Sequence, residues 1–467
     1  MKKQLAFAFL IVSCMSFNIS CGTQNSVQTA PDSMSDVQSG VILQCFDWSY
    51  ETIEAHMPEI AQSGYTALQV SCIQPAKEAT LGKSNEYWWL LYQPIDFCID
   101  DTGNSALGDK SGFIKMCETA HTYRIKVIVD VVANHLGNEN GYDISSAVSE
   151  ELRTQSEYWH ETAFEPVEYP NRESITDNSV GGLPDLNTEN PEIQAMVISY
   201  LEECIDAGAD GFRFDCAKHI AVPSEGSDFW PNVIRAAEDY YKTNGYYRDE
   251  TDLYCYGEVL GDTEGPDISE YTAYMSVTDN DTGNKIREAI VSHGARSAST
   301  PSLLKGADPD KTVLWAESHD TYENEEREST DTSDADILKT WAIVAVKNEV
   351  SALYFARTDG YRGGMMGEMC SDACFSDEVR AINHFHNLHD GAETYMSYSG
   401  NFIITERGDE AAVIVNCDGM DTDIDIKLSH LTDGTYRDTL TDAEFTLTAG
   451  QLTGHMGESG IVILERK

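Results

Sequence analysis

The sequence predicts an α/β protein built on a (β/α)8 TIM barrel, with a small subdomain inserted after the third strand and a C-terminal antiparallel β-sandwich. Three observations carry this prediction. From about residue 40 to 390, short β-rich apolar runs alternate with amphipathic stretches of helical length. A long Gly-, Asn- and Ser-rich segment interrupts the alternation, and an alternating strand pattern follows it at the end of the chain.

Eight apolar runs are the candidate strands, which is the number that closes such a barrel. They are residues 41–48, 65–72, 126–132, 211–215, 253–259, 273–277, 312–317 and 352–357, of which 273–277 has the weakest pattern. Candidate helices lie between the strands and carry apolar residues three and four positions apart, as the outer layer of a barrel requires. The four candidates are residues 50–64, 112–123, 191–209 and 336–349.

The same patterns divide the chain into domains. We assign the barrel to residues 39–135 and 189–390, the inserted subdomain to residues 136–188 and the sandwich to residues 391–467. The insertion is too long for a structureless loop in a compact domain, so a small subdomain is the better interpretation. After residue 390, the runs NFIITERG, AAVIVNC, DIDIKL, EFTLTAG and SGIVILER are the candidate sandwich strands.

The N-terminus resembles an export signal. Residues 1–21 place two lysines before an apolar run that is too short for a stable membrane span, and residues 22–38 form a polar, flexible linker. Cys21 resembles the lipidated cysteine of a bacterial lipoprotein, Cys14 is a competing site, and simple cleavage is the alternative. We expect export from a bacterial cell, followed either by lipid anchoring at the cell surface or by secretion.

Charge limits the possible partners. The chain has 31 Lys and Arg against 79 Asp and Glu, which gives a formal net charge of -48. Such a field repels nucleic acid and anionic membrane surfaces, whereas a neutral polysaccharide is compatible with it. The acidity is equally explained by a solubilising surface. Most cysteines beyond the signal sit in apolar strands, where Cys is a small buried hydrophobe, and only Cys370 and Cys374 are spaced for a local bridge.

Four of the candidate strands end in residues suited to catalysis. These residues are Asp130 with Asn134 and His135, Arg213 with Asp215, Glu258, and His319 with Asp320. The carboxyl ends of barrel strands converge on one face, so three or more carboxylates are expected at one mouth. A single carboxylate at a strand end is equally a helix cap or a loop hydrogen bond, but four such strands favour a site.

Paired carboxylates are what glycoside hydrolysis needs. A retaining enzyme uses an anionic nucleophile and a protonated acid about 5 Å apart. Asp215 and Glu258 fit these two roles. Arg213 lies two residues before Asp215, on the same side of the strand, where it can orient the nucleophile and keep its pKa low. A neighbouring carboxylate such as Asp320 would raise the pKa of the acid.

The segment EYWWLLYQP places aromatic side chains after the second strand. Trp88, Trp89 and Tyr92 offer flat faces on which sugar rings stack through their C–H sides. Aromatic residues in such a segment are more often part of the core. Their position beside the barrel mouth favours the functional interpretation.

These residues resemble the alpha-amylase family, glycoside hydrolase family thirteen. DVVANH (130–135), GFRFDCAKH (211–219), YGEV (256–259) and WAESHD (315–320) resemble its four sequence regions in order, and LPDLN (183–187) resembles a fifth. SHDTYENEERES resembles bacterial members closest to the animal-type group. The resemblance implies a calcium-binding subdomain after the third strand and a terminal β-sandwich, both of which the spacing also predicts.

The resemblance also implies roles for individual residues. It makes Asp215 the nucleophile, Glu258 the acid/base and Asp320 the third carboxylate, which grips the sugar hydroxyls. The residues implied to bind substrate are Trp88, Trp89, Tyr92, Gln93, His135, Arg213 and His319 around the cleaved sugar, and Lys218 and His219 on the leaving-group side. The residues implied to hold calcium are Asn134, Asp185, the backbone oxygen of His219 and a backbone oxygen near Thr176, an all-oxygen set that suits this ion. Capping of loops by Asn134 and Asp185 is the alternative.

We therefore expect a retaining, endo-acting alpha-amylase with calcium as cofactor. Its expected substrates are starch, glycogen and maltooligosaccharides, cleaved at internal α-1,4 bonds by double displacement. An α-glucan transglycosylase uses the same carboxylates, and a catalytically silent surface glycan-binding lipoprotein is a further alternative, against which the presence of all three carboxylates argues. We expect a monomer that binds no nucleic acid and contacts a membrane only through a lipid at Cys21.

Overall fold

The computed structural model describes residues 36–299, 306–347, 349–419 and 421–467. The predicted signal of residues 1–21, with Cys14 and Cys21, lies outside the described residues, as does most of the predicted linker. None of the described helices combines the length and apolar character that a membrane crossing needs.

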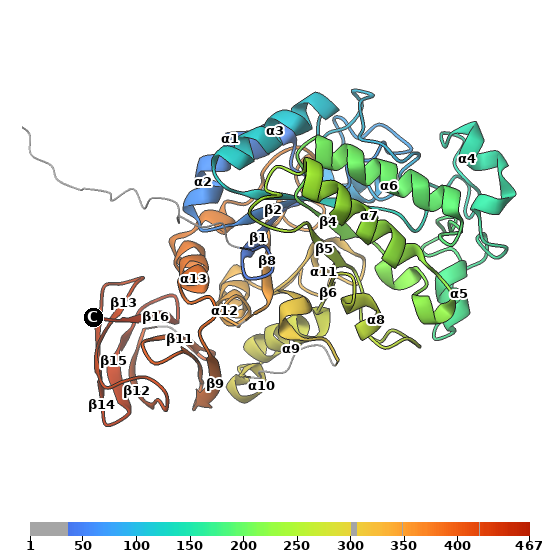
Figure 1. Cartoon of the computed structure of the whole chain (residues 1–467). Helices are drawn as coiled ribbons and strands as arrows, with labels where there is room; N and C mark the ends of the chain where they lie inside the picture. Colours follow the sequence, from blue (N-terminus) through green and yellow to red (C-terminus); the bar gives the residue numbers. More distant parts are fainter. Residues whose placement is uncertain (1–35, 300–305, 348, 420) are drawn as a thin grey trace, which may run out of the picture. The chain divides into compact units, whose positions relative to one another are not determined.

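Eight parallel strands close into a barrel, each paired with the next and the last with the first (Figure 1). They are β1 (Val41–Cys45), β2 (Ala67–Val70), β3 (Lys126–Val131), β4 (Gly211–Phe214), β5 (Tyr254–Gly257), β6 (Ser276–Thr278), β7 (Thr312–Trp315) and β8 (Ser351–Phe355). All eight predicted barrel strands are confirmed, including the weak sixth. The observed strands end before most of the polar residues that follow the apolar runs, so those residues lie in the loops at the barrel mouth.

Burial on both faces explains the continuous apolar runs. Every residue of β1 to β5 is buried. Alternate side chains such as Ile42, Ile128 and Tyr256 form one cluster, while Leu43 and Val129 belong to the larger core that includes the helices. Parallel strands covered on both faces have few positions where a polar side chain meets water.

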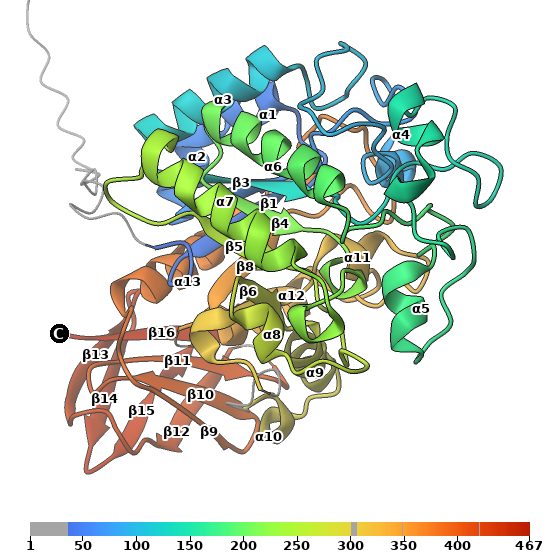
Figure 2. The ribbon, with the colours of Figure 1, turned by 45° about the vertical axis from the view of Figure 1, so that its right-hand side comes forward.

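The barrel strands alternate with helices that bury one face each. The longer helices are α3 (Lys110–Thr122), α6 (Pro191–Asp206), α7 (Phe229–Asn244), α9 (Asn280–Val291), α12 (Asp334–Val344) and α13 (Asp377–Leu388), and α6 and α7 run side by side (Figure 2). The four predicted helical segments are confirmed, but the first is divided at His56 into α1 (Tyr50–Ala55) and α2 (Met57–Gln62). Helices α7, α9 and α13 were not predicted.

Side-chain caps define where several of these helices begin. Asp109 accepts a hydrogen bond from the backbone of Gly112 at the start of α3, and Asn190 accepts one from Glu192 at the start of α6. These bonds satisfy backbone N–H groups that have no partner within the helix.

The segment at residues 136–188 carries structure of its own. It contains α4 (Glu150–Thr154), a 3-10 turn (Ser156–Tyr158) and α5 (Arg172–Asp177). Leu152 and Trp159 are buried within the main apolar core. His135 and Asp185 pair in an isolated antiparallel bridge, so the two ends of the segment meet beside β3. The exact domain boundaries stay predictions.

The C-terminal antiparallel domain is confirmed (Figure 1). Its eight strands join in one hydrogen-bonded sheet, and side chains on one face of that sheet form an apolar core of their own. The strands are β9 (Thr394–Ser399), β10 (Phe402–Arg407), β11 (Ala411–Asn416), β12 (Thr422–Lys427), β13 (Gly434–Asp438), β14 (Glu444–Thr448), β15 (Gln451–Met456) and β16 (Ile461–Arg466). Five of them were predicted, and β9, β13 and β15 were missed. Cys370 and Cys374 are free thiols, so the local bridge that their spacing allows is not formed.

Candidate active site

The polar residues predicted at the strand ends gather at one mouth of the barrel. Asp130 in β3 and Arg213 in β4 are paired by the strand register. Asp215 follows β4 directly and Glu258 follows β5 directly. Asp320 lies in α11 (His319–Glu323), the short helix after β7. The structure therefore brings together side chains that are up to 190 residues apart in the chain, counting from Asp130 to Asp320 (320 − 130 = 190).

Arg213 is the centre of this cluster. Its Nη1 donates to Asp215 Oδ1 at 2.9 Å and to Asp130 Oδ1 at 2.8 Å, and its Nη2 donates to Glu258 Oε2 at 2.6 Å. The backbone N–H of Cys216 donates to the same Glu258 oxygen at 3.0 Å. One guanidinium thus holds the two predicted catalytic carboxylates side by side, because both of its terminal nitrogens are engaged.

Crowding of carboxylates around one guanidinium shifts their pKa values apart. Burial raises the pKa of Asp215 well above its usual range, and the charge of Glu258 adds to this effect while Arg213 opposes it. Burial likewise raises the pKa of Asp320 to about 7, with the charge of Glu258 as the second cause. For Glu258, burial is outweighed by Arg213 and by the Cys216 N–H, so its pKa is lowered. The sequence predicted a low pKa for Asp215 and a raised pKa for Glu258, and both directions are reversed because burial dominates at Asp215 while Arg213 dominates at Glu258. The cluster therefore retains a proton near neutral pH in the absence of substrate.

Two buried histidines flank the carboxylates. Burial lowers the pKa of His135 and of His319 to about 4, so both rings are neutral at neutral pH. His319 Nδ1 lies 2.8 Å from Gln44 Nε2, and His135 Nε2 lies 3.1 Å from the backbone oxygen of Tyr92. His135 Nδ1 is buried and has no partner among the described residues. A neutral imidazole with a free nitrogen is suited to a hydroxyl group.

Aromatic side chains form one wall of the mouth. Tyr92 stacks on His319 with ring centroids 5.4 Å apart and an interplanar angle of 11°, and its hydroxyl donates to Asp130 at 2.8 Å. Trp88 packs edge-on against Tyr92 at 5.7 Å, and Trp89 is partly exposed beside Lys77. The indole nitrogen of Trp88 and Oε1 of Gln93 are buried without partners in the described part of the chain. Such unpaired groups are available to a polar ligand. 

Lys218 and His219 lie in a 3-10 turn (Ala217–His219), where the backbone N–H of Lys218 donates to the backbone oxygen of Glu258 at 3.1 Å. Tyr169, which reasoning from the sequence missed, comes from the inserted segment and lies over them. Its hydroxyl is 3.2 Å from His219 Nε2, and Lys218 Nζ is 5.6 Å from the centre of its ring. The side chain is 58% exposed, so one surface of the ring is open. An aromatic residue before a proline was the only signal for it in the sequence.

Two of the predicted calcium ligands, Asn134 and Asp185, lie in contact. Asn134 Nδ2 donates to Asp185 Oδ1 at 2.9 Å, and both residues are buried. Asn134 Oδ1 is buried without a partner in the described structure, which leaves an acceptor for a cation. Thr176 lines a cavity together with His160, Asp177 and Glu189. His219 binds the backbone oxygen of Ile175 through Nδ1 at 2.9 Å, next to Thr176.

His160 is a residue of this region that the sequence did not reveal. Its Nδ1 donates to Asp185 Oδ2 at 2.6 Å and its Nε2 lies 2.8 Å from Glu189 Oε2. Burial opposes its charge, but the two carboxylates outweigh burial and raise its pKa to about 10. His160 thus occupies one oxygen of Asp185, although burial still raises the pKa of Asp185 to about 7. The donor set otherwise fits calcium, since it offers a carboxylate, an amide oxygen and backbone oxygens.

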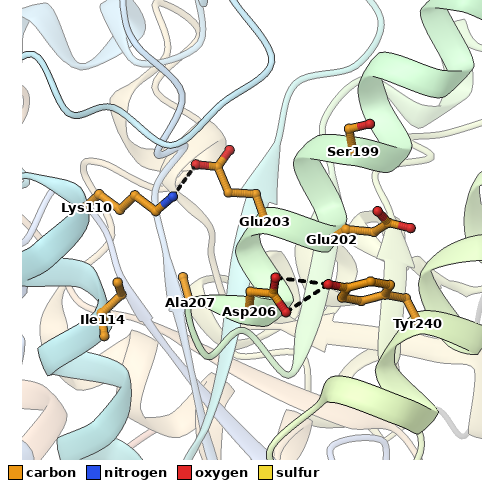
Figure 3. Close-up of a pocket in the computed structure, with 8 residues that line it drawn as sticks. All are labelled: Lys110, Ile114, Ser199, Glu202, Glu203, Asp206, Ala207 and Tyr240. Atoms are coloured by element: carbon orange, nitrogen blue, oxygen red, sulfur yellow. Dashed lines mark hydrogen bonds and ion pairs between the residues drawn. The ribbon is translucent and has the colours of Figure 1, made fainter.

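A second hollow, of about 300 Å³, lies among α3, α6 and α7 (Figure 3). Lys110 donates to Glu203 at 2.7 Å, and the hydroxyl of Tyr240 donates to both oxygens of Asp206 at 2.9 Å. None of the active-site residues lines this hollow. Its charged groups are largely paired with one another, so it offers little to a ligand.

Known proteins resemble this chain in sequence. The family model for the alpha-amylase catalytic domain matches residues 56–283. An alpha-amylase from Clostridium acetobutylicum is 35% identical over 92% of this chain and 54% of its own length. One from Butyrivibrio fibrisolvens is 33% identical over 92% of this chain and 48% of its own length. The chain spans about half the length of these curated relatives.

Solved structures share the fold. A mutant of alpha-amylase I from Eisenia fetida in complex with maltohexaose has a TM-score of 0.72 at 17% identity, and covers 92% of this chain and 97% of its own. The alpha-amylase from Geobacillus thermoleovorans complexed with acarbose has a TM-score of 0.71 at 16% identity, and covers 93% of this chain and 99% of its own. At these identities the comparison bears on the fold alone.

Proposed function

The chain belongs to the alpha-amylase family, and from this premise we propose that it is a retaining, endo-acting alpha-amylase that hydrolyses internal α-1,4-glucosidic bonds. Starch, glycogen and maltooligosaccharides are the proposed substrates. One observation carries the proposal: a single buried guanidinium holds Asp215 and Glu258 side by side at the mouth of the barrel. The names of the relatives, alpha-amylases in each case, support the same substrate class.

In the first step, Asp215 attacks the anomeric carbon while Glu258 donates a proton to the departing glycosidic oxygen. The bond between this carbon and oxygen breaks, and a covalent glycosyl-enzyme forms. Arg213 contacts both carboxylates and so positions them. The proton that the cluster retains must move to Glu258 when substrate enters. Transfer between neighbouring carboxyls leaves the total charge of the cluster unchanged.

In the second step, Glu258 removes a proton from water, and the water oxygen attacks the same anomeric carbon. Asp215 departs, so two inversions give net retention of the α configuration. Asp320 is proposed to hold sugar hydroxyls, with His135 and His319 as neutral hydrogen-bonding groups beside it.

Two groups of residues at the barrel mouth are proposed to bind the sugars on either side of the cleaved bond. Tyr92 and Trp88 are proposed to stack against sugar on one side of the cleaved bond, with Trp89 and Gln93 beyond them. Lys218, His219 and Tyr169 are proposed to receive the leaving sugar on the other side. Internal cleavage requires groups that bind sugar on both sides of the cleaved bond, which this assignment provides.

Hydrolysis of soluble starch by the purified full chain, followed through new reducing ends, tests the proposal. We expect maltooligosaccharides that are released initially as α anomers. Product analysis at high substrate concentration distinguishes hydrolysis from transfer to a sugar hydroxyl. A protein that releases no reducing ends from any α-glucan would contradict the functional proposal.

We propose that Asn134, Asp185 and the backbone oxygens of His219 and Thr176 hold calcium. The unpaired Asn134 Oδ1 supports this proposal, because a buried acceptor without a partner costs stability that a cation can restore. Bound calcium would supply a positive charge that joins the inserted segment to the barrel. His160 would then have to share or release Asp185.

Chelation is expected to destabilise the protein. With free calcium at 100 times its Kd, binding stabilises the folded state by about 2.7 kcal/mol, so a chelator should lower Tm by about 2–5 °C. Thermal unfolding with excess calcium or excess chelator measures this shift. The Asp185→Asn variant should respond much less than the parent. Equal Tm values for the parent under both conditions would count against the site.

The rate should also fall as pH rises through about 7. A carboxyl with a raised pKa is protonated below that value and loses its proton above it, and Asp320 has a pKa of about 7. The cluster then lacks the proton that Glu258 must donate. The pH profile of kcat/KM measures this limb, with circular dichroism as a check that the protein stays folded.

A substitution of Asp320 identifies the group whose titration causes this fall in kcat/KM at high pH. Asp320→Asn removes a negative charge, so the remaining acid should lose its proton more easily and the limb should move to lower pH. Each profile is normalised to its own maximum, because this variant is expected to be slower. A limb that stays in place would assign it to another group.

For the N-terminus, which lies outside the described residues, the proposal rests on sequence alone. We propose that residues 1–21 direct export from a bacterial cell and that Cys21 carries a lipid anchor, with simple secretion as the alternative. The protein is proposed to act as a monomer on soluble or surface-exposed glucan.

A further inference from the structure

Three potential metal ligands meet in the mouth of the barrel. A ring nitrogen of His135, a carboxylate oxygen of Asp215 and Sγ of Cys216 all lie within 4.8 Å of one another. Zinc binds nitrogen, oxygen and sulfur at about 2.0–2.3 Å, which places ligands around one tetrahedral ion about 3.3–3.8 Å apart. A bound ion would therefore draw the three groups closer together.

Cys216 occupies an unusual place for a thiol. It follows Asp215 directly and has a left-handed backbone with φ 49°, which turns the chain from β4 into the 3-10 turn at residues 217–219. Its backbone N–H is bound to Glu258. The residue as a whole is partly exposed. The hydrolysis proposed above gives the thiol no role.

One ring nitrogen of His135 is free to bind a ligand. Its Nδ1 has no partner in the described structure, and its Nε2 contacts only the backbone oxygen of Tyr92. A neutral imidazole carries one nitrogen with a free lone pair, which is the form that binds metals.

Charge favours a cation at this place. The carboxylates of Asp130, Asp215 and Glu258 share the single guanidinium of Arg213. The chain as a whole has a formal net charge of -48, so the mouth lies in a strongly negative field that concentrates divalent cations.

We propose that His135, Asp215 and Cys216 form an inhibitory binding site for zinc in the active-site mouth. A nitrogen, oxygen and sulfur donor set suits this borderline-soft ion and is distinct from the all-oxygen set proposed for calcium. Zinc bound there occupies the carboxylate that attacks the anomeric carbon, and it fills space that the sugar needs. Inhibition is therefore competitive with substrate. The site goes beyond the proposed hydrolysis, which needs no metal at these three residues.

Direct binding tests the site without any assay of activity. Cobalt(II) replaces zinc as a probe in the full chain kept saturated with calcium, and a thiolate ligand gives a sulfur-to-cobalt charge-transfer absorption. We expect this absorption in the parent, its displacement by zinc, and its loss in Cys216→Ala. The Cys98→Ala variant is the matched control, because Cys98 is another partly exposed thiol that lies outside the cluster. Absence of the band in the parent, or its persistence in Cys216→Ala, would overturn the proposal.

Inhibition of maltooligosaccharide hydrolysis is the second arm. Each variant is compared with its own rate without zinc, so a change in basal rate does not matter. Loss of one of three ligands should raise the zinc inhibition constant by at least ~10-fold in Cys216→Ala, and leave that of Cys98→Ala unchanged. Equal inhibition of Cys216→Ala and the parent would also reject the site. If the protein hydrolyses no α-glucan, the cobalt experiment still decides the question.

Discussion

Asp215→Asn is expected to lower kcat for starch hydrolysis by at least ~10⁴-fold, because an amide cannot form the glycosyl-enzyme bond. The substitution keeps the shape of the side chain. Its amide oxygen can still accept from Arg213 Nη1, as Asp215 Oδ1 does at 2.9 Å. Binding of maltooligosaccharides should therefore persist while turnover is lost, so kcat carries the effect and Kd does not. Release of reducing ends and calorimetric binding measure the two quantities separately.

A matched control comes from the opposite end of the same strand. Asp210 precedes β4, is buried, and accepts hydrogen bonds from His121, Tyr241 and the backbone of Val127. Asp210→Asn removes a buried charge from this network and should lower Tm while kcat changes little. If Asp215→Asn kept more than a hundredth of the parental kcat, Asp215 would not be the nucleophile. If the two variants lost activity equally, the loss would reflect folding rather than chemistry.

Removal of Glu258 should give the second largest effect, and one that depends on the leaving group. General acid/base catalysis contributes about 10²–10⁴-fold, so Glu258→Gln should lower the rate on starch by that factor. The glutamine oxygen can still accept from Arg213 and from the Cys216 N–H, so the local structure should hold. An aryl maltooligoside with an acidic leaving group needs no proton and should lose much less in its first step.

Rescue by azide distinguishes the role of Glu258 as acid/base from the role of Asp215 as nucleophile. Glu258→Ala opens space beside the anomeric carbon, and azide can then attack the glycosyl-enzyme in place of activated water. We expect azide to restore turnover of the aryl substrate and to give an α-glycosyl azide, because Asp215 still makes the first inversion. A β-glycosyl azide, or equal losses on starch and the aryl substrate, would assign the roles differently.

The fold was largely predictable because the barrel strands leave a clear signal. β1 to β5 are buried on both faces, so each appears as an uninterrupted apolar run. The C-terminal strands that were missed are less apolar. β9 contains partly and fully exposed residues along its length. β13 and β15 alternate buried with exposed positions as the predicted β12 and β14 do, but each contains a glycine, which weakens the strand pattern. Such spans are hard to tell from loops.

The missed helices have a similar cause. α7 has buried Phe229, Trp230 and Tyr241 on one face, but charged residues fill the opposite face and lower its mean hydropathy. α9 contains Gly283, whose ideal Cβ would lie 2.2 Å from the backbone oxygen of Trp315. In a sequence, a glycine predicts an interrupted helix. In α9, the glycine instead permits close packing against β7.

By itself, the sequence determined the barrel and the identity of the catalytic candidates. Strand ends are local features, and the carboxyl ends of barrel strands must converge, so Asp215, Glu258 and Asp320 could be placed at one mouth from the sequence alone. The sequence also carried the family resemblance, since its motifs are short and contiguous.

Only the tertiary structure decided which groups touch. Arg213 in β4 contacts Glu258, which follows β5. Tyr169 reaches Lys218 from the inserted segment. His160 hydrogen-bonds to Asp185, and Sγ of Cys216 lies within 4.8 Å of a ring nitrogen of His135. These contacts depend on loop paths and on side-chain directions. Neither a loop path nor a side-chain direction leaves a periodic pattern in the sequence. The free energy that selects these contacts arises only when the distant segments pack together.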